Sequence, residues 1–126
     1  MRVVVGLILA GFLLWSPICV FATTVRMQTS LGVIDIELMD AAAPATVANF
    51  LSYVASGAYV NSFIHRSVPG FIIQGGGYGW DSSVNRVYNI PANAPVVNEF
   101  SSSRSNLRGT ITKIGICRVV LAWYSS

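Results

Sequence analysis

Residues 62–77, SFIHRSVPGFIIQGGG, place one arginine and one glutamine among aliphatic side chains. Side chains two apart in a strand share a face, so a hairpin that turns at Pro69-Gly70 puts Arg66 and Gln74 among apolar neighbours. Burying such polar groups costs free energy unless a hydrogen-bond partner offsets it. The guanidinium stays charged and offers a rigid fork of N–H donors, so the rest of the chain must show which partner offsets this cost.

Two apolar residues follow the turn and are candidates to line a pocket beside the arginine. Phe71 and Ile72 would hold an apolar group while Arg66 donates hydrogen bonds to a polar atom next to it. Such a site needs no proton transfer, no metal ion and no cofactor. His65 is the only histidine, so a metal site with repeated histidine ligands is excluded, and we expect His65 to be structural.

Three segments together resemble bacterial members of the cyclophilin family of peptidyl-prolyl cis-trans isomerases. They are residues 62–77, TVANFLSYV at 46–54, and the pieces NEF and LRGTI within 98–111. The resemblance extends from about Val25 to Ile111. It implies an antiparallel β-barrel capped by helices, with a groove on the outer face that binds proline-containing peptide segments.

The resemblance also implies a role for each candidate residue. Arg66 corresponds to the catalytic arginine, and Gln74 to the amide that orients it. Phe71 corresponds to the floor of the proline pocket, and Ile72 to an apolar wall. The implied activity is peptidyl-prolyl cis-trans isomerisation that assists the folding of exported proteins.

The chemistry of that reaction suits these residue types. Conjugation resists twisting of an X-Pro bond, with a barrier of about 18–20 kcal/mol. In the twisted transition state the prolyl nitrogen regains a lone pair, so a fixed cation that donates hydrogen bonds there stabilises it more than either isomer. Arginine suits this role better than lysine because its fork of donors is rigid and always charged.

The elements that must position the site can be placed from hydrophobic periodicity. Residues 25–38 alternate apolar and polar side chains, with Asp35 and Glu37 on one face, and predict an antiparallel hairpin that has one wet face. Residues 44–56 follow a helical period and predict an amphipathic helix over the sheet. The apolar residues of that helix at helical spacing are Val47, Phe50, Leu51 and Val54.

The later chain is predicted to be less regular. Residues 78–95 are rich in Gly, Asn, Ser and Pro and indicate a long loop. Residues 96–100 favour a short strand, residues 101–107 a polar loop, and residues 108–112 the start of another strand.

The N-terminus predicts export. Met1-Arg2 precedes an uncharged apolar run, and Val20-Phe21-Ala22 suits cleavage by a signal peptidase before Thr23, so residues 1–22 are interpreted as a signal peptide. An uncleaved membrane anchor is the alternative. We expect a periplasmic or secreted protein without stable membrane association after cleavage. Because the net charge is only +3 and the basic residues do not cluster, we expect no nucleic-acid partner.

The resemblance ends abruptly after Ile111. The tail from 112 to 126, TKIGICRVVLAWYSS, does not resemble the family. In related sequences this region supplies a second pocket phenylalanine, a tryptophan and a histidine, none of which can be located here. We therefore expect a partial cyclophilin-like domain over 23–111 and a truncated or frameshifted product, with a genuine short variant as the alternative. The apolar tail could add a makeshift strand or promote aggregation.

The predicted fold class is mainly β: an incomplete cyclophilin-like antiparallel barrel with one amphipathic helix in its N-terminal half and an N-terminal signal helix. An unclosed barrel leaves strand edges without partners, so retained activity in this chain is itself a question. Two alternatives to an active isomerase stay open. One is a non-catalytic proline-peptide-binding or chaperone-like module, and the other is a product that does not fold.

Overall fold

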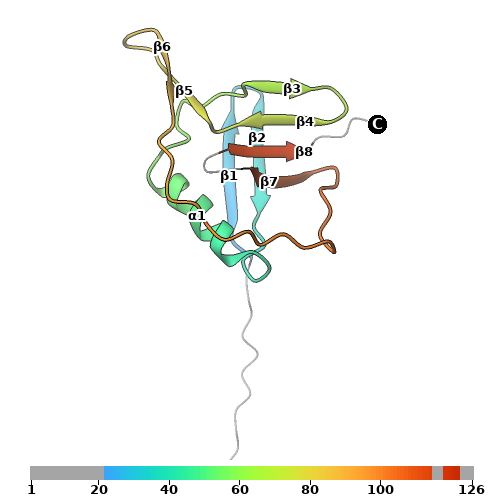
Figure 1. Cartoon of the computed structure of the whole chain (residues 1–126). Helices are drawn as coiled ribbons and strands as arrows, with labels where there is room; N and C mark the ends of the chain where they lie inside the picture. Colours follow the sequence, from blue (N-terminus) through green and yellow to red (C-terminus); the bar gives the residue numbers. More distant parts are fainter. Residues whose placement is uncertain (1–21, 115–117, 123–126) are drawn as a thin grey trace, which may run out of the picture.

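The computed structural model describes residues 22–114 and 118–122. Within this part, the chain forms eight strands and one helix, and every strand pairing is antiparallel. The mainly β prediction is therefore confirmed (Figure 1). The predicted signal helix lies outside the described residues.

The first hairpin forms where the alternating pattern predicts it. Strands β1 (Thr24–Thr29) and β2 (Gly32–Glu37) pair in register, with Val25 opposite Ile36. On the opposite, wet face, Nε of Arg26 donates to Oδ1 of Asp35 at 2.7 Å. The other face of this hairpin is apolar and packs against the helix that follows.

Helix α1 spans Pro44–Ala55 and packs on that apolar face (Figure 1). Proline suits its first turn, because the missing N–H would have no partner there, and Gly57 (φ 70°) follows its end. The buried cluster consists of Ile36, Leu38, Val47 and Phe50. One predicted core position is wrong: Val54 is exposed, and Tyr53 is buried instead, with 2% of its surface exposed.

A four-stranded sheet holds the segment that carries the candidate site. Strands β3 (Arg66–Val68), β4 (Ile72–Gly75), β7 (Thr110–Ile114) and β8 (Arg118–Ala122) lie in the order β3-β4-β8-β7. The tail of the chain therefore adds a strand, which inserts between β4 and β7. Figure 1 shows the strands of this sheet running across those of the first hairpin.

Two predictions for the later chain are wrong. Residues 78–95 are not one long loop, because β5 (Tyr78–Asp81) and β6 (Arg86–Asn89) form a hairpin that projects from the body (Figure 1). Asn85 makes its turn at φ 52°, a left-handed conformation that asparagine tolerates. Conversely, residues 96–100 form no strand, because no neighbouring segment pairs with them.

The strands do not close into a barrel. In the described residues they form three separate sheets, of two, four and two strands. Edge strands β3 and β7 thus each have one side without a strand partner in this part of the chain. Within residues 22–114 and 118–122, no helix is long and apolar enough to cross a membrane.

The long connection after β6 is fastened to α1. Ala43 at the start of the helix offers no side-chain acceptor, and Glu99 takes this role from far along the chain. The amides of Ala45 and Thr46 donate to its two carboxylate oxygens at 3.1 and 2.8 Å. The amide of Thr46 is the main cause that holds the pKa of Glu99 below its usual value, with Arg104 adding to the effect. Figure 1 shows this connection, in orange, passing along the helix.

We expect Glu99→Gln to lower the midpoint of thermal unfolding by about 4–8 °C at pH 7, as loss of a helix cap does in a small domain. A carboxylate whose pKa is lowered by folding stabilises above its unfolded pKa, and this contribution is lost as the pH falls through the folded pKa. The difference between variant and wild type should therefore shrink toward pH 3.

Thermal scans by circular dichroism at several pH values measure this effect. Glu37→Gln is the matched control, because Glu37 lies on the exposed face of β2 and should leave the midpoint unchanged. An equal loss at pH 3 and pH 7 in the Glu99 variant would contradict a role for its charge.

Candidate active site

The predicted polar pair lies in register on neighbouring strands. The amide of Phe71 donates to the carbonyl of Val68 at 3.0 Å, and Gly70 (φ 71°) lets the chain turn tightly between β3 and β4. The pairing sets Arg66 opposite Gln74. Directly opposed residues of an antiparallel pair project from the same face, so these two side chains share one face of the sheet.

The two members of the pair differ in exposure. Gln74 is buried, with 7% of its surface exposed, whereas Arg66 is exposed. Among the described residues, no hydrogen bond joins the two side chains, and the guanidinium makes no ion pair there. The desolvation cost expected from the sequence therefore falls on the amide of Gln74, whereas Arg66 stays exposed to solvent.

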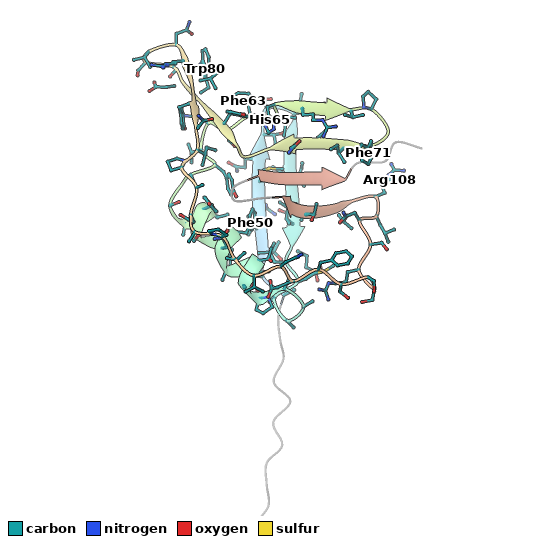
Figure 2. All side chains as sticks on the ribbon, in the orientation of Figure 1. Phe50, Phe63, His65, Phe71, Trp80 and Arg108 are labelled. Carbon is teal, nitrogen blue, oxygen red and sulfur yellow. The ribbon has the colours of Figure 1, made fainter. Side chains whose placement is uncertain are left out.

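The two apolar candidates also differ. Ile72 is buried and lies opposite Val68 on the same face as Gln74, as a wall residue would. Phe71 lies at the turn with 47% of its surface exposed, and Figure 2 shows it at the end of the sheet near the turn. With nearly half of its surface exposed, Phe71 is a partly covered residue at the rim rather than the buried floor of a pocket. All four candidate residues are nonetheless held on one short hairpin.

His65 lies just before β3 and is half-buried. Its ring packs edge-on against Tyr78, with the ring centroids 5.0 Å apart, and its amide donates to the carbonyl of Gln74 at 3.0 Å. Phe63 stacks against the same tyrosine at 6.3 Å. These contacts fit the expected structural role and anchor the start of the site hairpin on β5 (Figure 2).

Comparison with known proteins decides the family. Residues 24–114 match the family model described as cyclophilin type peptidyl-prolyl cis-trans isomerase/CLD, which is most of the chain. The chain belongs to the cyclophilin family. The candidate hairpin lies wholly within the matched residues.

Curated bacterial cyclophilins are similar over most of this chain. It is 43% identical to peptidyl-prolyl cis-trans isomerase A of Dickeya dadantii over 91 residues, 72% of this chain and 45% of the relative. It is 40% identical to a peptidyl-prolyl cis-trans isomerase of Acinetobacter baylyi over 107 residues, 85% of this chain and 54% of the relative. The chain thus spans about half the length of the curated cyclophilins that it matches.

Solved structures agree on the fold. A Cryptosporidium parvum cyclophilin type peptidyl-prolyl cis-trans isomerase superposes with a TM-score of 0.62 at 26% identity, covering 84% of this chain and 70% of that chain. A second structure of the same protein, in the presence of the dipeptide Ala-Pro, superposes with a TM-score of 0.60, also at 26% identity, covering 82% of this chain and 70% of that chain. The cyclophilin-like fold is therefore retained although the barrel is open.

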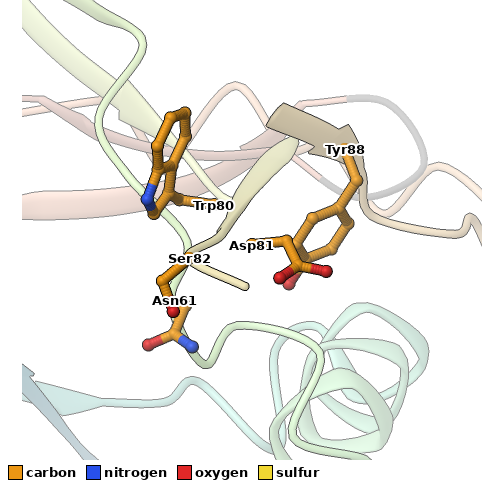
Figure 3. Close-up of a pocket in the computed structure, with 5 residues that line it drawn as sticks. All are labelled: Asn61, Trp80, Asp81, Ser82 and Tyr88. Atoms are coloured by element: carbon orange, nitrogen blue, oxygen red, sulfur yellow. The ribbon is translucent and has the colours of Figure 1, made fainter. Parts of the chain in front are cut away.

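A hollow on the projecting β5–β6 hairpin lies apart from this site. Its volume is about 390 Å³, it opens to solvent, and Figure 3 shows the residues that line it: Asn61, Trp80, Asp81, Ser82 and Tyr88. None of the four predicted residues contributes to it, and Figure 2 places Trp80 well away from Phe71.

Sequence reasoning missed this hollow because it interpreted the segment as a loop. The ring of Tyr88 occupies the space that a side chain at Gly79 would need, so a larger residue at that register position would displace the ring. The hydroxyl and amide of Ser83 donate to Asp81 and lower the pKa of its carboxyl, so Asp81 is ionised at neutral pH. The alternating Tyr-Gly-Trp of β5 was the available signal for a strand.

Proposed function

We propose that this cyclophilin-family chain is a peptidyl-prolyl cis-trans isomerase that acts on X-Pro bonds in exported proteins. The observation that carries the proposal is the register of the site hairpin. It sets an exposed arginine opposite a buried glutamine, on the hairpin that also carries the partly exposed Phe71, within the segment that matches the family. The presence of Ala-Pro with a solved relative supports proline-containing peptides as the substrate class.

The proposed mechanism uses electrostatic stabilisation alone. The guanidinium of Arg66 would donate a hydrogen bond to the prolyl nitrogen as that atom regains its lone pair in the twisted bond. Phe71 would hold the proline ring, with the buried Ile72 as an apolar wall. Gln74 would orient the guanidinium once the peptide is bound. No bond forms or breaks, so no proton acceptor is needed.

We also propose that the protein works in the periplasm or outside the cell. The support is the apolar N-terminal run with small residues before Thr23, which suits export and cleavage. Exported chains with proline-containing segments would then be its partners. Cell fractionation followed by detection of the chain tests this location, and a purely cytoplasmic chain would refute it.

The activity is tested by nuclear magnetic resonance exchange spectroscopy on a short Ala-Pro peptide. Uncatalysed isomerisation takes tens to hundreds of seconds at 25 °C, so added chain should speed exchange between the cis and trans signals measurably. An exchange rate that stays unchanged when the folded chain is added would refute the proposal, whether or not the peptide signals shift.

A second candidate function is non-catalytic binding of proline-containing peptides. The partial exposure of Phe71 favours it, because an exposed apolar surface can bind a proline ring without stabilising the twisted X-Pro bond. Peptide signals that shift on addition of the chain while the exchange rate stays constant would support this function over catalysis. A Phe71→Ala variant should then abolish the shift.

A further inference from the structure

Asp40 holds the main chain and the side chain of Thr23 at once. The backbone nitrogen of Thr23 donates to Oδ2 of Asp40 at 2.8 Å, and the Thr23 hydroxyl donates to Oδ1 at 2.8 Å. The carbonyl of Thr23 in turn accepts the amide of Leu38 at 2.8 Å. Three hydrogen bonds therefore fix Thr23 against the connection between β2 and α1.

Thr23 is also the residue at which the sequence predicts that the mature chain begins. We propose that cleavage between Ala22 and Thr23 creates an α-ammonium group that forms an ion pair with Asp40, so that maturation locks the start of β1. The inference rests on the export proposed above. It concerns the N-terminus of the mature protein and does not depend on isomerase activity.

The chemical step is hydrolysis of one peptide bond by a signal peptidase, with water as co-reactant. The water oxygen bonds to the carbonyl carbon of Ala22, and the bond from that carbon to the nitrogen of Thr23 breaks. The leader is released with a C-terminal carboxylate on Ala22. The nitrogen of Thr23 takes protons and becomes an ammonium group at neutral pH. Ala22, on the other side of the bond that is cut, is exposed.

The surroundings favour a cation at this nitrogen. The backbone amide and hydroxyl of Thr23 already lower the pKa of Asp40, so its carboxylate is charged at neutral pH. Glu37, opposite Thr24 on β2, is a second carboxylate at this end of the hairpin. Helix α1 carries no charged residue, and the nearest cation along β1, Arg26, is already paired with Asp35. Among the side chains that the structure describes, the charged groups named at this end of the hairpin that could attract an ammonium group are therefore the carboxylates of Asp40 and Glu37.

The first measurement is the N-terminus of the exported protein. The full gene, leader included, is expressed in a bacterial host, and the mature protein is analysed by mass spectrometry. We expect Thr23 as the first residue. An intact leader, or a start at any other residue, would overturn the proposal while leaving the isomerase assay unaffected.

The second measurement is the pKa of the new α-amino group. Acylation of the N-terminus by an amine-reactive ester is followed against pH by peptide mapping, which separates it from Lys113, the only lysine. We expect a midpoint about one pKa unit above the ordinary ~7.7–8.0, because an adjacent carboxylate favours the charged form. Asp40→Asn should return the midpoint to the ordinary value.

Asp35→Asn is the matched control, since it removes a carboxylate of the same hairpin that pairs with Arg26 instead. It should leave the α-amino midpoint unchanged. An ordinary midpoint in the wild-type mature protein would overturn the ion pair, whether the protein is folded or not. Equal shifts in the Asp40 and Asp35 variants would show a general charge effect and would also overturn it.

Discussion

Arg66→Ala is expected to lower kcat/KM for an X-Pro peptide by about 10²–10³-fold, the usual cost of removing one preorganised donor from a transition state. The fold should be unaffected, because the guanidinium is exposed and makes no ion pair among the described residues. Exchange spectroscopy gives the rate, and circular dichroism checks that the variant folds as the wild type does.

Two further variants make this test specific. Arg66→Lys keeps the charge but loses the rigid fork, so its rate should fall between those of wild type and alanine variant. Arg86→Ala removes an exposed arginine on β6, in the projecting hairpin, and should leave the rate unchanged. A full rate in Arg66→Ala would mean that any isomerase activity arises elsewhere on the chain.

Phe50→Ala is expected to destabilise the fold by about 3–5 kcal/mol, the typical cost of deleting a buried phenylalanine ring. Phe50 belongs to the cluster that joins α1 to the first hairpin, and its ring lies 5.7 Å from that of Tyr59. Because whole domains are stable by only about 5–15 kcal/mol, this one change should unfold a large fraction of the molecules. Urea titration followed by circular dichroism measures the loss.

Val54→Ala on the same helix is the control for this experiment. Val54 is exposed, so its truncation should cost less than about 0.5 kcal/mol. If both variants lost the same small amount, α1 would not be docked on the hairpin in solution. The structure of the core, rather than the site, would then need revision.

Local patterns were sufficient to predict the first hairpin, the bounds of α1 and the turn of the site hairpin. Each depends on contacts between residues close in sequence: alternation in β1 and β2, proline and glycine at the ends of α1, and Gly70 at the turn. The pairing of Arg66 with Gln74 follows from the same local geometry. The motif in this hairpin was likewise sufficient to identify the family, which the comparison with known proteins then established.

Local patterns were not sufficient to predict which residues of α1 are buried. Helical spacing permits either Tyr53 or Val54 to face inward, and hydrophobicity favours the valine. The choice of Tyr53 depends on a distant partner, because the amide of Asn93 donates to its hydroxyl at 2.6 Å. Burial of a tyrosine needs such a partner for its polar end, and no window of the helix sequence contains one.

Residue types and their spacing along the chain thus identified the site hairpin, the helix and the family of this protein. Tertiary structure decided that Gln74 is buried while Arg66 stays in solvent, that Glu99 caps a helix about fifty residues earlier, and that β8 pairs with β4. The physical reason is the range of the interactions. Backbone periodicity and turn geometry act between neighbours, whereas burial, capping by a distant carboxylate and strand order depend on which segments meet after the chain has folded.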